Sequence, residues 1–133
     1  MNRPILFILC LLSVLSLMAC QSNNFKLDKE NVTSIEVRGW DTSEEFQTIK
    51  DQQVIADVVN GLNKSGTVDT SNKDFMMPEY RLQFKHDEET LYEMGYYTDP
   101  MKMGSKPGNF WDKKNGEFYE FEYKLTVKEQ QDQ

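Results

Sequence analysis

Residues 51–64, DQQVIADVVNGLNK, decide the fold of this chain. Their apolar residues recur at intervals of three and four positions, which places them on one face of an α-helix. These residues are Val54, Ile55, Val58, Val59 and Leu62. Asp51 is typical of a helix N-cap, and Ser65-Gly66 is typical of a helix end. The stretch therefore predicts one amphipathic helix, and its apolar face needs a partner.

Short segments of alternating polar and apolar residues surround this helix, and alternation is the pattern of half-buried strands. Two of them precede the helix, at 32–40 and 45–50, and four follow it, at 79–85, 90–97, 109–113 and 119–127. Asn115-Gly116 between apolar segments is the strongest hairpin signal in the chain. We expect loops at 67–77, which is polar, and at 98–108, which holds two prolines and two glycines.

The predicted order of elements is therefore β-β-α-β-β-β-β. An antiparallel sheet can bury one face and leave the other to water, so a single amphipathic helix finds its partner on the buried face. We expect an α+β fold in which the helix packs on an antiparallel sheet of about five or six strands. One domain over 32–128 accounts for these elements, and residues 129–133 are expected to form a polar tail.

The N-terminus has the pattern of an export signal. Arg3 supplies a short positive start, and residues 5–18, ILFILCLLSVLSLM, are apolar or small and carry no charge. This run is shorter than the about 20 residues that a transmembrane helix needs, and the polar residues from Gln21 onward end it abruptly. We therefore expect residues 1–19 to be a signal peptide.

The expected cleavage site resembles the lipobox of bacterial lipoproteins. Leu17-Met18-Ala19-Cys20 places an aliphatic residue at −3, a small residue at −1 and a cysteine at +1, whereas an ordinary site has small residues at −3 and −1. The resemblance implies that the Cys20 thiol receives a diacylglyceryl group and that cleavage occurs before Cys20. Residues 20–31 are then expected to hold the lipidated cysteine and a flexible tether. We therefore expect the mature protein to be anchored on the outer, extracytoplasmic face of the cell membrane.

The charge of the chain excludes some partners. The formal net charge is −7, and it becomes −8 when residues 1–19, whose only charge is Arg3, are removed. An acidic surface repels phosphate backbones, so we expect no nucleic-acid partner. It also repels anionic lipid head groups, so membrane attachment is expected to depend on the covalent anchor. Because Cys10 leaves with the signal, Cys20 has no partner for an intrachain disulfide.

The sequence lacks the residue sets of common catalytic and metal sites. His86 is the only histidine, and it lies in a charged turn that offers neither a catalytic partner nor a dry pocket. A zinc site and a serine–histidine–acid triad both need more than this residue supplies. The acidic clusters at 41–45 and 86–89 lack the spacing of a calcium-binding EF-hand loop. We expect no catalytic residues, no cofactor and no metal site.

The aromatic residues are more numerous than one thin core needs, and four of them are candidates for a binding surface: Trp40, Phe110, Trp111 and Phe118. Trp40 falls on the polar face of its strand, and Phe118 breaks the alternation of the last one. Exposed aromatics often mark sites for a peptide, a glycan or a partner protein. The alternative is that these residues cover the second face of the sheet or the loop at 98–108, which is the commoner use of such residues.

Parts of the chain resemble the YhfM-like family, a group of small lipoproteins of Gram-positive bacteria. The resemblance rests on the lipobox, on residues 46–51 leading into 54–64, on Gly66-Thr67-Val68-Asp69 and on the following Pro78-Glu79-Tyr80. It covers residues 15–97. It implies the lipoprotein address and the α+β fold, and it carries no activity.

Three functions are compatible with these features. The first is a non-enzymatic module at the cell surface that binds a protein, a peptide or a cell-wall component. The second is an envelope enzyme that uses paired carboxylates, for which Glu120 beside another acid in a cleft would be the sign. The third is a structural or stress-related accessory lipoprotein without a small ligand. The anchor, the spare aromatics and the missing catalytic set favour the first.

Overall fold

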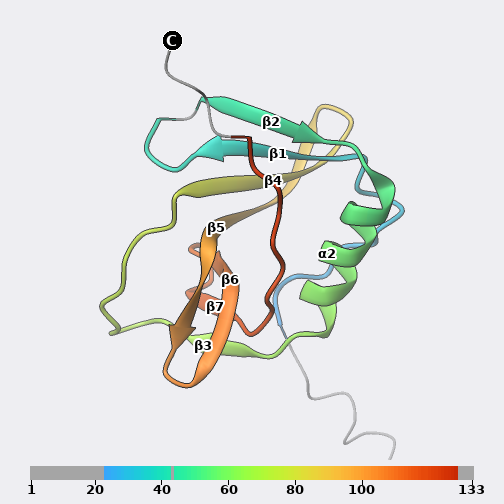
Figure 1. The fold of residues 1–133 in the computed structure, drawn as a ribbon. Coiled ribbons are helices and arrows are strands. Elements are labelled where there is room, and N and C mark those ends of the chain that lie inside the picture. The colour runs from blue at the N-terminus through green and yellow to red at the C-terminus, as the bar shows by residue number, and fades with distance from the viewer. Residues whose placement is uncertain (1–22, 43, 129–133) are drawn as a thin grey trace, which may run out of the picture.

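The computed structural model describes residues 23–42 and 44–128 (Figure 1). These residues form one helix and one antiparallel sheet of seven strands in the order β2-β1-β4-β5-β6-β7-β3. The elements are β1 Ser34–Gly39, β2 Glu45–Ile49, α2 Gln52–Lys64, β3 Thr67–Asp69, β4 Tyr80–His86, β5 Glu89–Met103, β6 Lys106–Asp112 and β7 Glu117–Tyr119. The predicted α+β class is confirmed in this coarse form. The expected signal peptide, Cys20 and the tail at 129–133 lie outside the described residues.

Helix α2 forms where the sequence predicts it. The Asp51 carboxylate accepts hydrogen bonds from the backbone N–H groups of Gln53 and Val54, which satisfies two donors that a helix leaves free at its start. Ser65 is the C-cap, and its N–H donates to the carbonyl of Leu62 at 3.3 Å. The four fully buried residues of the helix, Ile55, Val58, Val59 and Leu62, share the main core with apolar residues of β1, β4, β5 and β6.

The sheet is larger than expected, in part because the predicted loop at 98–108 is a hairpin. Strands β5 and β6 continue through it and meet at a turn in which Gly104 has a φ of 66°. Pro100 lies where the pairing of β5 with β6 is irregular. Pro107 precedes the part of β6 that pairs with β7, which begins at Phe110, so one edge of β6 is unpaired there. Both prolines therefore occupy positions that tolerate a residue without an N–H.

The predictions for the polar connection and the last strand were also wrong. Residues 67–69, expected to be part of a loop, form β3 and pair with β7 at the sheet edge. The strand expected over 119–127 ends at Tyr119, where the Phe121 N–H donates to the Tyr119 carbonyl at 2.8 Å and turns the chain out of the sheet. The sheet therefore gains a short edge strand and loses most of the predicted last strand.

After β7 the chain crosses the sheet as an extended C-terminal segment, residues 120–128, seen in red in Figure 1. Sheet side chains bind its backbone: the Tyr96 hydroxyl donates to the carbonyl of Tyr123 at 2.9 Å and accepts from the N–H of Leu125 at 2.8 Å. Leu125 is buried in the main core. The alternation that predicted a strand therefore reflects burial of alternate side chains without a hydrogen-bonded ladder.

The segment before β1 is not the tether that the sequence predicts. Phe25 is fully buried, and its ring meets those of Phe84 and Tyr92 edge-on, with centroids 5.2 and 5.1 Å apart. The Asn23 side-chain nitrogen lies 2.9 Å from the carbonyl oxygen of Leu62, at the end of α2. The packed domain therefore includes residues 23–31, which precede the predicted boundary at residue 32.

The two faces of the sheet differ. The inner face is covered by α2, by the C-terminal segment and by the residues before β1 (Figure 1). The outer face carries polar side chains over β1, β4 and β5. At the β6–β7 end it carries a second apolar cluster, in which Tyr97, Met103, Trp111 and Phe118 are buried and Trp40, Val68, Phe75 and Met101 are partly buried.

Candidate functional site

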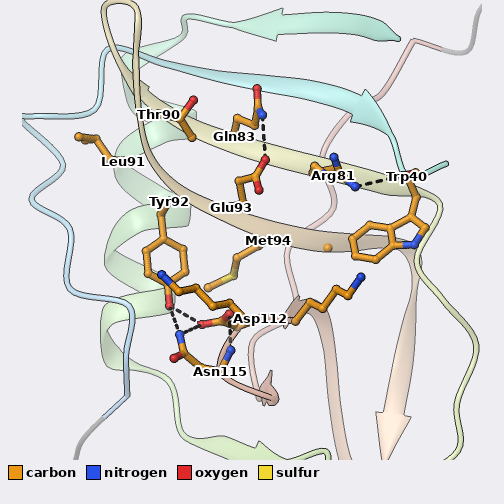
Figure 2. A pocket seen from close by; sticks show the side chains of 13 residues that line it. Trp40, Arg81, Gln83, Thr90, Leu91, Tyr92, Glu93, Met94, Asp112 and Asn115 are labelled. Carbon is orange, nitrogen blue, oxygen red and sulfur yellow. Dashed lines mark hydrogen bonds between the residues drawn. The ribbon is translucent and has the colours of Figure 1, made fainter. Parts of the chain in front are cut away.

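A cleft of about 830 Å³ lies along β4 and β5, beside the turn that joins β6 to β7 (Figure 2). It forms because β6 is shorter than its neighbour. In the described structure β5 pairs with β6 only from Gly95 onward, so the preceding residues 90–94 pair with β4 alone. The space that β6 leaves beside β5 is bordered by the turn residues Lys113, Lys114 and Asn115.

Trp40 lies at one end of this cleft, and two cations lie near its ring. The Arg81 guanidinium carbon is 5.3 Å from the centroid of the indole ring, and the Lys113 ammonium nitrogen is 5.5 Å from it. Both distances are within the range of cation–π attraction. Arg81 also donates from Nη2 to the Trp40 carbonyl at 3.3 Å. The indole is therefore approached by two positive groups from different elements, β4 and the β6–β7 turn.

The position of Trp40 depends on a glycine in β5. A Cβ atom at Gly95 would lie 2.6 Å from Pro78 and 3.3 Å from the Trp40 ring, so a larger residue would push both away from the strand. The Trp111 ring packs beside the indole, with ring centroids 5.8 Å apart and the rings tilted by 37°. Trp40 is thus supported by the second apolar cluster and remains partly exposed toward the cleft.

A hydrogen-bonded group closes the other end of the cleft. The Asp112 carboxylate accepts from the Tyr92 hydroxyl, from the Asn115 side chain at 2.7 Å and from the Asn115 backbone N–H at 3.1 Å. Burial and the bond to Asp112 raise the pKa of Tyr92, so this phenol stays protonated and serves as a donor. Asp112 is only 1 % exposed, and these three donors satisfy it.

A row of hydrogen-bonded polar side chains crosses the outer face and reaches the cleft at Gln83 and Glu93. Glu36 pairs with Arg38 at 2.8 Å and with Lys85 at 3.1 Å, Arg38 donates to Gln83, and Gln83 donates to Glu93 at 2.8 Å. Partial burial raises the pKa of Glu36, but the hydrogen bonds from Arg38 and Lys85 outweigh it and hold the pKa below its usual value. The acidic groups on this face therefore have donors bound to them.

The positive groups of the cleft form no ion pair with any described residue. The ion pairs between described residues use Arg38, Lys85 and Lys106 as the cations, and His86 lies 3.7 Å from the Asp87 carboxylate. Within the described residues no carboxylate lies at ion-pair distance from Arg81, Lys113 or Lys114. The charge that the cleft can offer to a ligand is therefore positive, although the whole chain is acidic.

The structure separates the four aromatic residues that the sequence singled out. Trp40 lines the cleft. Phe110 is fully buried in the main core and stacks on Phe121, with centroids 5.5 Å apart. Trp111 and Phe118 are buried in the second cluster on the outer face. A binding surface made of all four is wrong, and the alternative interpretation, that such residues cover the second face, holds for Trp111 and Phe118.

The sequence did not single out Arg81, Lys113 or Tyr92 as site residues. Outward alternation did place Arg81 on the exposed face of its strand, and Lys113 belongs to the hairpin tip that the sequence indicated. Their meeting around Trp40 depends on pairing between distant strands. Of the other candidates, His86 is exposed, with Nδ1 2.7 Å from the Asn31 carbonyl oxygen, and Glu120 pairs with Lys106 at 3.5 Å.

Three further findings concern the described residues and the whole chain. Within 23–42 and 44–128, no three His, Cys, Asp or Glu residues are grouped so that they could hold a metal ion. The helix found there is too short and too polar to span a membrane. Comparisons of the chain with protein-family models, with curated proteins and with solved structures give no match.

Proposed function

We propose that this chain is a lipid-anchored lipoprotein of the extracytoplasmic face of the cell membrane, of the YhfM-like kind, and that its domain is a non-enzymatic binding module. The anchor is Cys20, and the binding site is the cleft beside Trp40. The observation that supports binding is the pair of cations, Arg81 and Lys113, held on the Trp40 ring without a carboxylate partner in the described residues. Arg81 is half-buried and Lys113 is exposed, so both can donate charge-assisted hydrogen bonds to an anionic ligand in the cleft.

The anchor is tested by Cys20→Ser in a bacterial host. The diacylglyceryl group is transferred to a thiol, and a serine hydroxyl is a far weaker nucleophile. The wild-type chain should incorporate labelled palmitate and begin at a modified Cys20, whereas the variant should do neither and should keep residues 1–19. Mass spectrometry of the N-terminus decides the question. An unmodified wild-type terminus at a residue other than Cys20 contradicts the lipoprotein proposal.

Binding is tested by sedimenting the full chain, held in detergent, with a washed insoluble cell-wall fraction. We expect the wild-type chain to be retained and Trp40→Ala to be released, because the alanine removes the ring that holds both cations. Phe46→Ala is the control, since Phe46 is a half-buried aromatic of β2 outside the cleft. Equal retention of Trp40→Ala and wild type, with both folded, would rule out the cleft as the binding site.

A further inference from the structure

The charge of the cleft is opposite to that of the molecule. The chain has a net charge of −7, yet three lysine and arginine side chains line the cleft and none of them pairs with a described carboxylate. Two acids also line it, and their donors are uncharged: Glu93 accepts from Gln83, and Asp112 accepts from three donors of Tyr92 and Asn115, so three cations face two carboxylates. A ligand would therefore meet local positive charge at Arg81, Lys113 and Lys114.

The remaining lining groups suit hydroxyls. Thr90 is exposed at one end of the cleft. Both amide hydrogens of Asn115 are directed to Tyr92 and Asp112, which leaves its side-chain oxygen as an acceptor. Glu93 uses one carboxylate oxygen toward Gln83 and has a second one, which can accept from a hydroxyl. The cleft thus combines three cations with neutral and acidic acceptors.

From this combination we propose that the cleft binds an anionic polyhydroxylated polymer, a sugar or polyol chain that carries phosphate or carboxylate groups. The inference deepens the proposed binding function and rests on it. One anionic group is held by Arg81 and Lys113 beside Trp40, where the guanidinium supplies a planar pair of donors. The hydroxyls of the adjoining unit bind Asn115, Thr90 and Glu93.

An acidic peptide fits these groups less well. Its carboxylates would follow one another closely along the chain, and Glu93 lies between Arg81 and Thr90 along one wall of the cleft (Figure 2). Like charges at short range repel, whereas a hydroxylated unit between two anionic groups places a donor opposite Glu93. The alternation of positive and acceptor groups therefore favours a polymer whose charges are separated by hydroxylated units.

The test uses the full chain in detergent and fluorescence anisotropy of four labelled polymers: poly(glycerol phosphate), polygalacturonate, neutral dextran and polyglutamate. We expect one or both of the first two to bind, and the difference between them identifies phosphate or carboxylate as the anion. Arg81→Gln and Lys113→Gln should each weaken binding about tenfold or more, because each removes a charge-assisted contact. Binding should also weaken at an ionic strength of about 1 M, where the Debye length is about 3 Å.

Lys124→Gln is the matched control, because it removes one exposed positive charge on the C-terminal segment, over the opposite face. It should leave binding unchanged. Lys113 is an exposed turn residue, so Lys113→Gln will fold even if Arg81→Gln does not. Tighter binding of polyglutamate, equal binding of dextran, or failure of both polyanions overturns the inference. If both fail while the cell wall still retains the chain through Trp40, the proposed binding function stands and only its ligand class is wrong.

Discussion

The burial of Phe25 could not be predicted from the sequence around it. It lies among Asn23, Asn24 and Lys26, and this polar composition is typical of a tether. One apolar residue has no periodicity, so nothing in the local pattern distinguishes a core residue from an exposed one. The structure buries it completely, and its backbone N–H donates to the Tyr119 hydroxyl at 3.0 Å. This side chain joins the start of the described chain to the inner face of the sheet.

We predict that Phe25→Ala destabilises the domain by about 3–5 kcal/mol, the usual cost of removing a buried phenylalanine. That loss is a large part of the about 5–15 kcal/mol that stabilises a typical domain. Chemical denaturation with tryptophan fluorescence measures it. Lys26→Ala, which truncates the exposed neighbour, should change the stability by less than about 0.5 kcal/mol. Equal denaturation midpoints for Phe25→Ala and wild type would contradict the packing of Phe25 in the core.

At the scale of elements, α2 was predictable and the C-terminal segment was not. The helix repeats its apolar spacing over several turns and carries its own cap, so local signals suffice. Residues 120–128 alternate as a strand does, but a strand also needs a neighbour to pair with. Tyr96 and Asn109 supply hydrogen bonds to the segment instead, the latter accepting from the Tyr123 N–H at 2.9 Å. Side-chain bonds of this kind leave no periodic trace in the sequence.

The helix face is tested by Val58→Asp. Val58 is fully buried in the main core, and a charge placed there without a partner costs several kcal/mol, which approaches the whole stability of the domain. We expect the variant not to fold, as judged by loss of the cooperative thermal transition. Asp57→Ala changes the exposed neighbouring residue and should melt within a few degrees of wild type. A Val58→Asp variant that melts like the wild type contradicts the packing of α2 on the sheet.

For the whole molecule, the sequence predicted the class, the helix and the order of most strands. Cap residues, hairpin turns and alternation act locally, and they predicted α2, β1, β2, β4 and the β4–β5 and β6–β7 hairpins. These local signals do not indicate which distant segments pair with one another. The β3 strand has three residues, too few for a pattern, and it exists because β7 lies beside it. The prolines that indicated a loop are tolerated because the pairing around them is incomplete.

The candidate site depends on the same non-local pairing. Trp40 follows β1, Arg81 belongs to β4 and Lys113 follows β6, so only the strand order of the sheet brings them together. The sequence indicated Trp40 because an aromatic stood on a polar face, and that signal was informative. It also indicated Phe110, Trp111 and Phe118, which are buried. An excess of aromatics can serve a second apolar cluster as readily as a binding surface, and residue type alone does not distinguish the two.

The tyrosines make the whole fold sensitive to alkaline pH. Burial raises the pKa of five of them: Tyr92, Tyr96, Tyr97, Tyr119 and Tyr123. For Tyr119 burial is the largest cause, and the pKa rises to about 12 from 10.0. Because the folded state holds this proton more tightly than the unfolded state, the stabilisation is complete below pH 10 and is lost as the pH rises toward 12. A shift of this size corresponds to about 2–3 kcal/mol.

We therefore predict that the free energy of unfolding falls steeply between about pH 10 and about pH 12, and that phenolate absorbance rises in step with unfolding. Tyr119→Phe should reduce the slope by up to about one proton, since the replaced group no longer ionises. The same variant should be less stable than wild type at neutral pH by about 1 kcal/mol, because the N–H of Phe25 loses its acceptor. Urea denaturation at several alkaline pH values gives both quantities. Phenolate absorbance that rises fully while the fold is intact, or equal slopes for the two proteins, would mean that Tyr119 is accessible to hydroxide in the native domain and does not couple its proton to folding.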